Sequence, residues 1–258
     1  FSPEQTWLSY TGSSSAVPLV ADADGDGKTD LIIFDNGTWL VATSTGSSFN
    51  TPQTWHSGFG STGDQPIPAD FNGDQLLDLG LYQPSSGVWQ VALGTGQPSP
   101  RFASATTWIS NFGSSSDAPL VGDFNADGLT DVGFIGKTSG NGSIAFSNGR
   151  QFINQGQLLS GFGPNEPHTS ADLNGDGLTD PVYYNTTTGT IFYAPSSGAG
   201  FGAPVELMAQ HPFGSPGDPL RSPTVGFQVG DFNGAGISGF GAFDANSGIT
   251  EIAFASGT

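Results

Sequence analysis

The nine-residue segment DADGDGKTD at 22–30 most constrains the fold, because it recurs along the chain. Close copies are DFNGDQLLD at 70–78, DFNADGLTD at 123–131 and DLNGDGLTD at 172–180, and a degenerate copy, DFNGAGISG, occupies 231–239. A repeat of about 50 residues is typical of folds such as β-propellers. The sequence therefore predicts one structural unit around each acidic segment, and the five units together account for the whole chain.

Each unit repeats the same order of short apolar runs separated by turn residues. In the first unit these runs are PLVAD at 18–22, DLIIFD at 30–35, WLVATS at 39–44 and TPQTWHSGFG at 51–60. Runs of this length, rich in Val, Ile, Phe, Trp and Thr and bounded by Gly, Asn, Asp and Pro, indicate strands. No segment shows the 10 to 12 residues of capped helical periodicity that a helix would need. The predicted fold class is all-β, with four antiparallel strands per unit.

The two ends of the chain predict how the units close. Residues 4–10, EQTWLSY, match the fourth strand of a unit, and residues 248–256, GITEIAFAS, match a third strand. An N-terminal strand that completes the last sheet would leave no unpaired neighbour between the first and last blades. We therefore predict a single domain over 1–258, a five-bladed β-propeller closed by its N-terminal strand. The alternative is that these residues form part of a larger propeller.

The charge of the chain excludes two classes of partner. The formal net charge is −18, and Lys and Arg together number five. Binding to nucleic acid or to an anionic membrane surface needs clustered basic residues. No apolar run approaches the roughly 20 residues that a membrane-spanning helix requires. We expect neither a nucleic-acid partner nor insertion into a membrane.

The acidic segments have the oxygen pattern of a calcium loop. Side chains at positions 1, 3, 5 and 9 and the carbonyl at position 7 can converge on one hard cation, and glycine at position 6 permits the sharp turn. EF-hands share the opening spacing, but position 12 here is Ile33 instead of Glu, and strands flank the loop. Asp, Asn and Gly also favour turns without a metal, yet four copies with Asp at positions 1, 5 and 9 favour calcium.

Four structural calcium ions are therefore predicted, one in each intact loop. The fifth loop has Ala235 and Gly239 at positions 5 and 9 and is expected to be empty, and Gln75 replaces the turn glycine of the second loop. Because calcium binds the folded state, its removal should lower the melting temperature. The predicted ligands, with position 7 acting through its carbonyl, are Asp22, Asp24, Asp26, Lys28 and Asp30; Asp70, Asn72, Asp74, Leu76 and Asp78; Asp123, Asn125, Asp127, Leu129 and Asp131; and Asp172, Asn174, Asp176, Leu178 and Asp180.

Phe-Gly pairs precede the acidic loops at Phe59-Gly60, Phe112-Gly113, Phe162-Gly163 and Phe213-Gly214, each followed by a proline. With these pairs the chain resembles the FG-GAP (VCBS-type) repeat family, which includes the propeller of integrin α-subunits and integrin-like lectins. The resemblance implies that each acidic loop lies between the first two strands of a blade and binds calcium through the positions given above. The better-known members usually have seven blades, so their ligand sites are not transferred to this chain.

Tryptophans provide the candidate ligand contacts. Two follow the turn between the second and third strands, and others lie near the end of the fourth strand, on the face predicted to be opposite the acidic loops. Aromatic rings with polar neighbours suit a pyranose, which has an apolar face and a rim of hydroxyls. Packing between blades is the alternative. The candidate ligand residues are Trp39, Trp89, Trp55, His56 and Trp108.

The sequence predicts no catalytic residue. It has no cysteine and no G-x-S-x-G motif, and most acids belong to the calcium loops, which leaves His56 beside Trp55 as the least implausible candidate. The favoured hypothesis is a secreted or cell-surface, calcium-stabilised module that binds carbohydrate, because extracellular calcium fills even weak sites. The alternatives are a protein-interaction or adhesion scaffold of a larger surface protein and, less favoured, a polysaccharide lyase or hydrolase. The partner is thus a glycan or a protein, and the oligomeric state is not predicted.

Overall fold

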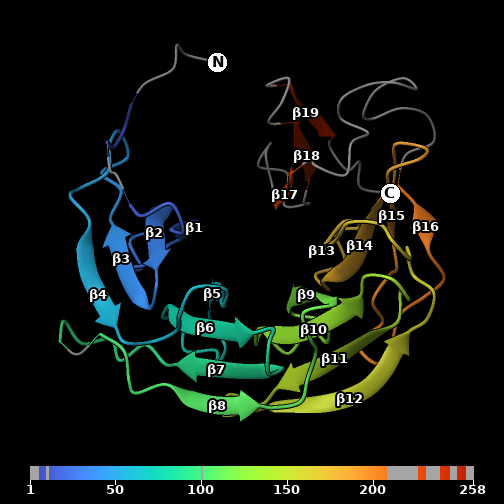
Figure 1. Cartoon of the computed structure of the whole chain (residues 1–258), viewed down its shortest axis with the longest axis horizontal. Helices are drawn as coiled ribbons and strands as arrows, with labels where there is room; N and C mark the ends of the chain where they lie inside the picture. Colours follow the sequence, from blue (N-terminus) through green and yellow to red (C-terminus); the bar gives the residue numbers. More distant parts are fainter. Residues whose placement is uncertain are drawn as a thin grey trace. The chain divides into compact units, whose positions relative to one another are not determined.

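The computed structural model describes residues 6–9, 12–99 and 101–207, together with the backbone of three later strands (Figure 1). The chain divides into two compact units, 1–115 with 148–151 and 116–147 with 152–258. Every helix or strand assigned in the described part is a β-strand, which confirms the predicted all-β class. In this part no helix is long and apolar enough to cross a membrane.

The first unit contains two antiparallel sheets of four strands, in the orders β1-β2-β3-β4 and β5-β6-β7-β8. The first sheet consists of β1 (Val17–Ala21), β2 (Asp30–Asp35), β3 (Thr38–Ala42) and β4 (Gln53–Ser57). The second consists of β5 (Gln65–Ala69), β6 (Asp78–Gln83), β7 (Val88–Ala92) and β8 (Thr106–Ile109).

The second unit contains two further sheets of four strands and one of three. These are β9 (Asp117–Gly122), β10 (Asp131–Gly136), β11 (Gly142–Ser147) and β12 (Phe152–Leu159); β13 (His168–Ala171), β14 (Asp180–Asn185), β15 (Thr190–Tyr193) and β16 (Val205–Glu206); and β17 (Gly226–Gly230), β18 (Gly239–Asp244) and β19 (Ile249–Ala253).

Each sheet is a meander in which strands consecutive in the sequence are hydrogen-bonded neighbours, as in the blade of a β-propeller. The prediction of four antiparallel strands per blade is confirmed for four blades. The predicted number of five such blades is wrong: the described residues form four of them, and the last sheet has three strands.

The described part of the predicted N-terminal strand, residues 6–9, is also not a strand. The rest of 4–10 lies outside the described residues. The carbonyl of Trp7 accepts a hydrogen bond of 3.3 Å from the N–H of Phe49, and the two rings meet edge to face with centroids 5.5 Å apart. These contacts hold Trp7 against the loop that follows β3, in place of a strand pairing.

Three Phe-Gly pairs fasten the end of a blade to the turn between its second and third strands, and the fourth predicted pair, Phe213-Gly214, lies outside the described residues. The N–H of Phe59 donates to the carbonyl of Gly37 at 3.1 Å, and the Phe59 carbonyl accepts from Trp39 Nε1 at 2.9 Å. Gly60 has φ +98, and a Cβ there would lie 2.9 Å from side-chain atoms of Leu81 and Phe34. Glycine is therefore required both by the backbone angle and by the close approach of the next blade. The pairs at 112–113 and 162–163 repeat the backbone bond, to the carbonyls of Gly87 and Gly140 at 2.9 Å.

Candidate functional site

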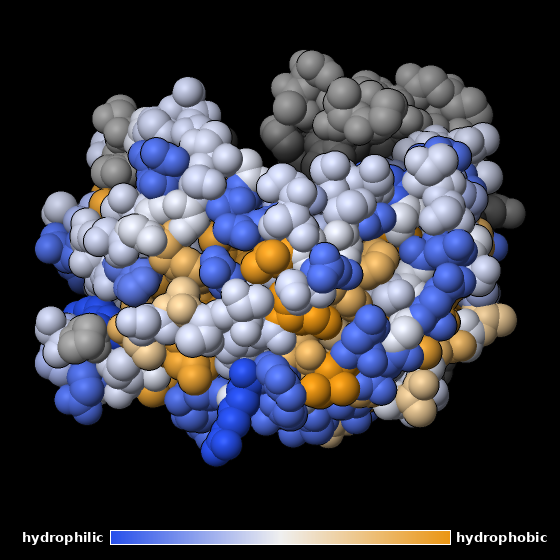
Figure 2. All heavy atoms as spheres, turned by 60° about the horizontal axis from the view of Figure 1, so that its bottom comes forward, coloured by the Kyte–Doolittle hydropathy of each residue, from blue (hydrophilic) through white to orange (hydrophobic). Residues whose placement is uncertain are grey.

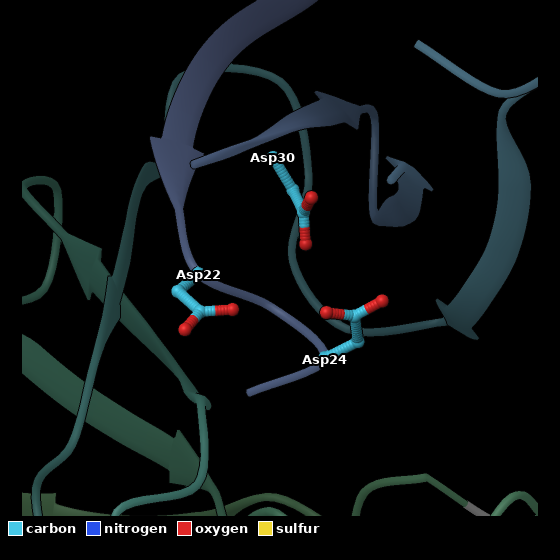
Figure 3. A group of neighbouring side chains, drawn as sticks. All are labelled: Asp22, Asp24 and Asp30. Carbon is cyan, nitrogen blue, oxygen red and sulfur yellow. The ribbon is translucent and has the colours of Figure 1, made fainter. Parts of the chain in front are cut away.

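The acidic loops connect the first and second strands of each blade, where the FG-GAP resemblance places them. In the first loop, carboxylate oxygens of Asp22, Asp24 and Asp30 all lie within 4.8 Å of one another. Figure 3 shows the three side chains turned toward a common point, with Asp22 and Asp24 in the loop and Asp30 at the start of β2. Three oxygen donors that converge in this way have the chemistry that a hard divalent cation needs.

The aspartate at position 1 holds the loop in its turn. Asp22 Oδ1 accepts hydrogen bonds from the N–H groups of Gly25 and Asp26 at 2.9 and 3.1 Å, and its Oδ2 accepts from Gly27 at 2.8 Å. The other three loops repeat the bond from position 6 to Oδ2 of position 1, with donors Gln75, Gly128 and Gly177 at 2.8, 2.9 and 2.9 Å. The turn is thus formed by hydrogen bonds within the chain itself.

The aspartate at position 9 is buried in every intact loop, with a relative exposure of 0%. One of its oxygens accepts a bond of 2.7 Å from a backbone N–H at the end of the third strand or just after it, a partner 14 or 16 residues later that sequence reasoning missed. These donors are Ser44 to Asp30, Gly94 to Asp78, Ser147 to Asp131 and Ser196 to Asp180. Position 9 therefore ties the acidic loop to the third strand of its own blade, a role beyond the predicted metal ligand.

Burial strongly perturbs three of these carboxyls. It raises the pKa of Asp78 to about 6 and the pKa values of Asp131 and Asp180 to about 7, and the neighbouring aspartates of each loop push in the same direction. Carboxyls this reluctant to ionise fit a site built for a cation.

Positions 3 and 5 distinguish the first loop from the others. In the second loop Asn72 Nδ2 donates to Asp74 Oδ2 at 3.0 Å, and the third and fourth loops repeat this bond at 2.9 Å. In the first loop position 3 is Asp24, whose pKa is raised by burial and by the charges of Asp30 and Asp26. The Lys28 ammonium instead forms an ion pair with Asp26. The first loop thus carries one more carboxylate and one internal cation.

Two loops contain a non-glycine residue in the left-handed region. Gln75, at position 6 of the second loop, has φ 66, and Ala126, at position 4 of the third, has φ 60. Glycine occupies both positions in the other intact loops, so the backbone is strained at Gln75 and at Ala126. Of the predicted fifth loop, residues 231–238 lie outside the described residues.

Three of the five predicted ligand residues are packed inside the blades. Trp39 and Trp89 are 0% and 2% exposed and donate Nε1–H to the carbonyls of Phe59 and Phe112, each at 2.9 Å. Trp108 is 5% exposed and meets a phenylalanine ring edge to face. Packing, the alternative reading of these tryptophans, therefore holds for Trp39, Trp89 and Trp108.

Trp55 and His56 are half-buried and line a groove along β4. Three adjoining hollows of about 340, 430 and 420 Å³ share lining residues: Trp55 and Arg101 line the first and second, and His56 and Ser57 line the second and third. We call these hollows together the β4 groove. Asp24 and Gly25 of the first acidic loop also line its first hollow. The prediction that the tryptophans and the acidic loops lie on opposite faces is therefore wrong for Trp55.

The groove combines aromatic, amide and charged groups. The Arg101 guanidinium lies over the Trp55 ring, with Cζ 3.9 Å from the centroid. Burial lowers the pKa of His56, so its imidazole is neutral at pH 7, and its ring meets Phe59 and Phe102 edge to face. Figure 2 shows a face on which hydrophilic and intermediate residues surround patches of hydrophobic ones, in keeping with a chain in which 11% of residues are charged.

Comparison with known proteins supports the family resemblance and the fold. Residues 22–81 match the model of the FG-GAP-like repeat. A lectin of Agrocybe aegerita that recognises non-reducing terminal N-acetylglucosamine superposes with a TM-score of 0.66 at 20% identity, over 90% of this chain and 61% of the lectin. The predicted resemblance to FG-GAP/VCBS-type β-propellers is therefore confirmed. This chain spans 61% of the length of that lectin, and at this identity the likeness concerns the fold.

Other similarities are weaker. A Tc holotoxin pore of Photorhabdus luminescens matches at 18% identity and a TM-score of 0.49, over 92% of this chain and 14% of the toxin chain. A rhamnogalacturonan lyase of Bacillus licheniformis matches at 13% identity and a TM-score of 0.35, over 81% of this chain and 49% of the lyase. Neither similarity supports an inference about this protein. No curated protein matches the chain in sequence.

Proposed function

We propose that this protein is a calcium-stabilised, non-catalytic module that binds carbohydrate in the β4 groove. The observation that carries the proposal is the groove itself, in which a half-buried tryptophan, an arginine and several amide and hydroxyl side chains line adjoining hollows. Each hollow is within the range of volumes typical of small-ligand sites. Hydroxyl-rich ligands suit such a lining because amides and hydroxyls both donate and accept hydrogen bonds.

Calcium would be held by the oxygens of the four intact loops. The convergent carboxylates of Asp22, Asp24 and Asp30 support this assignment, as do the raised pKa values of the buried aspartates at position 9 of the other three loops. A bound dication would neutralise carboxyls that otherwise repel one another, and would link the first two strands of each blade to the third through position 9. Its role is structural, and no step of ligand chemistry passes through it. An extracellular location, secreted or on the cell surface, accords with loops of this kind because calcium is plentiful there.

A non-catalytic role accords with the groove's titratable groups. Among the described residues that line it, the one carboxylate is Asp24, whereas most glycoside hydrolases need two carboxyl groups across the scissile bond. His56 is neutral and packs against two phenylalanine rings. Turnover of a polysaccharide that is lost in His56→Ala would revive the enzyme alternative.

A glycan array run in calcium and in EDTA tests the proposal. We expect binding to a limited set of glycans in calcium, weakened in EDTA, and lost in Trp55→Ala. Trp108→Phe is the matched control, because Trp108 occupies the equivalent position of the next blade but is buried. Silence on all glycans would reject the carbohydrate proposal and favour the protein-interaction alternative.

A further inference from the structure

The geometry points to an acidic oligosaccharide as the ligand of the β4 groove, with Arg101 as the residue that binds its carboxylate. This inference rests on the proposed function and deepens it by naming the ligand class. The ligand is a chain of several sugars that includes a uronic acid, and Arg101 determines the preference for that sugar over its neutral form.

The groove is long enough for more than one sugar ring. Its three hollows follow one another along β4, a strand of five residues, and together extend from the first acidic loop to Phe59 and Gly60. Five residues of strand span about 16 Å. A single pyranose would fill one hollow and leave the other two empty, so an oligosaccharide matches the site better.

Arg101 is a cation for which the described residues provide no acceptor. Within the described residues its guanidinium makes neither an ion pair nor a hydrogen bond, whereas Lys28 is paired with Asp26. The chain has five basic residues against 23 acidic ones. An arginine that stays unpaired among so many acids, and that lines two adjoining hollows, is available for an acidic group of the ligand.

The guanidinium is also held in place. The guanidinium lies over the Trp55 ring, with Cζ 3.9 Å from the ring centroid, and a guanidinium can bind a planar carboxylate through two parallel hydrogen bonds. Its backbone is fixed as well, because the Arg101 carbonyl accepts from Thr95 N–H and Oγ1 at 2.9 and 3.1 Å. Less side-chain entropy is therefore lost when an anion binds.

The rest of the lining is neutral apart from one acid. Side chains of Gln75, Gln97, Thr54, Ser57 and Gln90 offer amides and hydroxyls to sugar hydroxyls. Asp24 also lines the first hollow, where the proposed calcium ion would neutralise it. Arg101 is the one lysine or arginine among the described residues that line the groove, so the ligand's acidic group is assigned to it.

The contact between an arginine and a tryptophan occurs at one place among the repeats, between Arg101 of the second blade and Trp55 of the first. Each of the four repeats has a phenylalanine at an equivalent position, namely Phe49, Phe102, Phe152 and Phe201. The residues directly before these phenylalanines are Ser48, Arg101, Gln151 and Gly200, respectively. Four residues before the Phe-Gly pair the chain has Trp55, Trp108 and Leu158. Arginine next to a half-buried tryptophan thus arises once among these repeats, which is typical of a specificity residue and not of a repeated packing contact.

Calorimetric titration with trigalacturonic acid and with its methyl ester tests the inference on the full chain in saturating calcium. The two probes have the same rings and differ in charge. We expect the acid to bind at least about tenfold more tightly than the ester, with a preference that shrinks as salt is raised. Equal affinities would overturn the inference. Binding of neutral glycans without an acid preference would leave the proposed function standing, whereas absence of all glycan binding would reject both.

Two variants assign the preference to its residue. Arg101→Ala should bring the affinities for acid and ester to within about threefold of each other, while Arg150→Ala, which removes an exposed cation outside the groove, should leave the preference for the acid unchanged. Asp24→Asn places at position 3 the residue found in the other three loops, and it should keep or increase the preference. If the preference survives in Arg101→Ala, or is lost in Asp24→Asn, the carboxylate binds elsewhere, for example to calcium in the first loop, and the inference is wrong.

Discussion

Gln75 holds a backbone conformation that glycine holds at the same position of the other three loops. Its φ is 66, against 81, 82 and 85 for Gly27, Gly128 and Gly177. The left-handed region costs an L-residue roughly 1–2 kcal/mol, which a glycine would avoid. A glycine would in turn lower the stability by about 0.4–1 kcal/mol, because it has more conformational freedom in the unfolded chain. The strain is retained at a loop that also borders the β4 groove.

Gln75→Gly should therefore raise the free energy of unfolding by about 0.5–1 kcal/mol. Urea denaturation in saturating calcium measures it, and Gln97→Gly, a change of the same type in the neighbouring loop at a residue without a positive φ, is the control. A lower stability in Gln75→Gly would show that its backbone conformation is not strained.

Lys28 also affects its own loop, because its ammonium forms an ion pair with the carboxylate of Asp26. Position 7 is leucine in the other three loops, and its proposed contribution to calcium is a backbone carbonyl that any residue supplies. Lys28→Leu should thus increase calcium affinity at the first loop severalfold by freeing Asp26 and removing a positive charge. Calorimetric titration with calcium measures it, and an unchanged or weaker affinity of that site would contradict the account.

Residues in the loops were predictable from sequence where the interaction is local. Of the oxygens predicted at positions 1, 3, 5 and 9, the structure brings together the carboxylates of positions 1, 3 and 9 in the first loop. The partner of position 9 was not predictable, because Ser44 reaches Asp30 only after β2 and β3 have paired. The unpaired Arg101 was missed for the same reason, since its stacking on Trp55 joins two hairpins far apart in sequence.

Elements of the fold are held by contacts at the blade ends. The Phe-Gly pair accepts a bond from a buried tryptophan and donates one to the turn between the second and third strands. The alternation of strand residues was readable from sequence, but which sheet face is covered by a neighbour was not. That is why Trp39 and Trp89, predicted as ligand candidates, are packed in the blade interior.

Trp39→Phe should destabilise the protein by about 2 kcal/mol, because it removes buried ring atoms and leaves the Phe59 carbonyl without its donor. Trp55→Ala should cost less than half of this, since its ring is half-buried, yet it should abolish glycan binding. Chemical denaturation and glycan titration of the two variants check the contrast. Loss of glycan binding in Trp39→Phe with unchanged stability would show that Trp39 contacts the ligand and is not a packing residue.

The whole molecule combines a net charge of −18 with acidic groups concentrated in the loops. Blade architecture was predictable because the repeat, the strand periodicity and the turn residues agree with one another. The number of complete blades was not, because it depends on how the terminal segments pair, and residue 7 packs on Phe49 instead of forming a strand.

Calcium-free protein should lose stability as pH rises from 4 to 7. The pKa of Asp131 is raised to about 7 in the folded state, above its unfolded value of about 4, so the protonated carboxyl favours folding at low pH. That contribution is lost as pH rises through the folded pKa. Asp78 and Asp180 act in the same direction, with pKa values of about 6 and 7.

Denaturation in EDTA across this pH range measures the effect, and Asp131→Asn should reduce the slope. In saturating calcium the slope should vanish or reverse, because calcium requires the deprotonated carboxylates. The same slope in EDTA and in calcium would contradict the role given to these buried aspartates.

The central claim is that the acidic loops bind calcium and thereby stabilise the blades, and thermal unfolding in calcium and in EDTA tests it most directly. Each site stabilises the folded state by about 2.7 kcal/mol when calcium is 100-fold above Kd, which is about 5–10 °C for a chain of this size. We predict that the melting temperature falls in EDTA by at least the contribution of one site, about 5–10 °C, and that it recovers when calcium is added back in excess. An identical melting temperature in calcium and in EDTA would contradict the account.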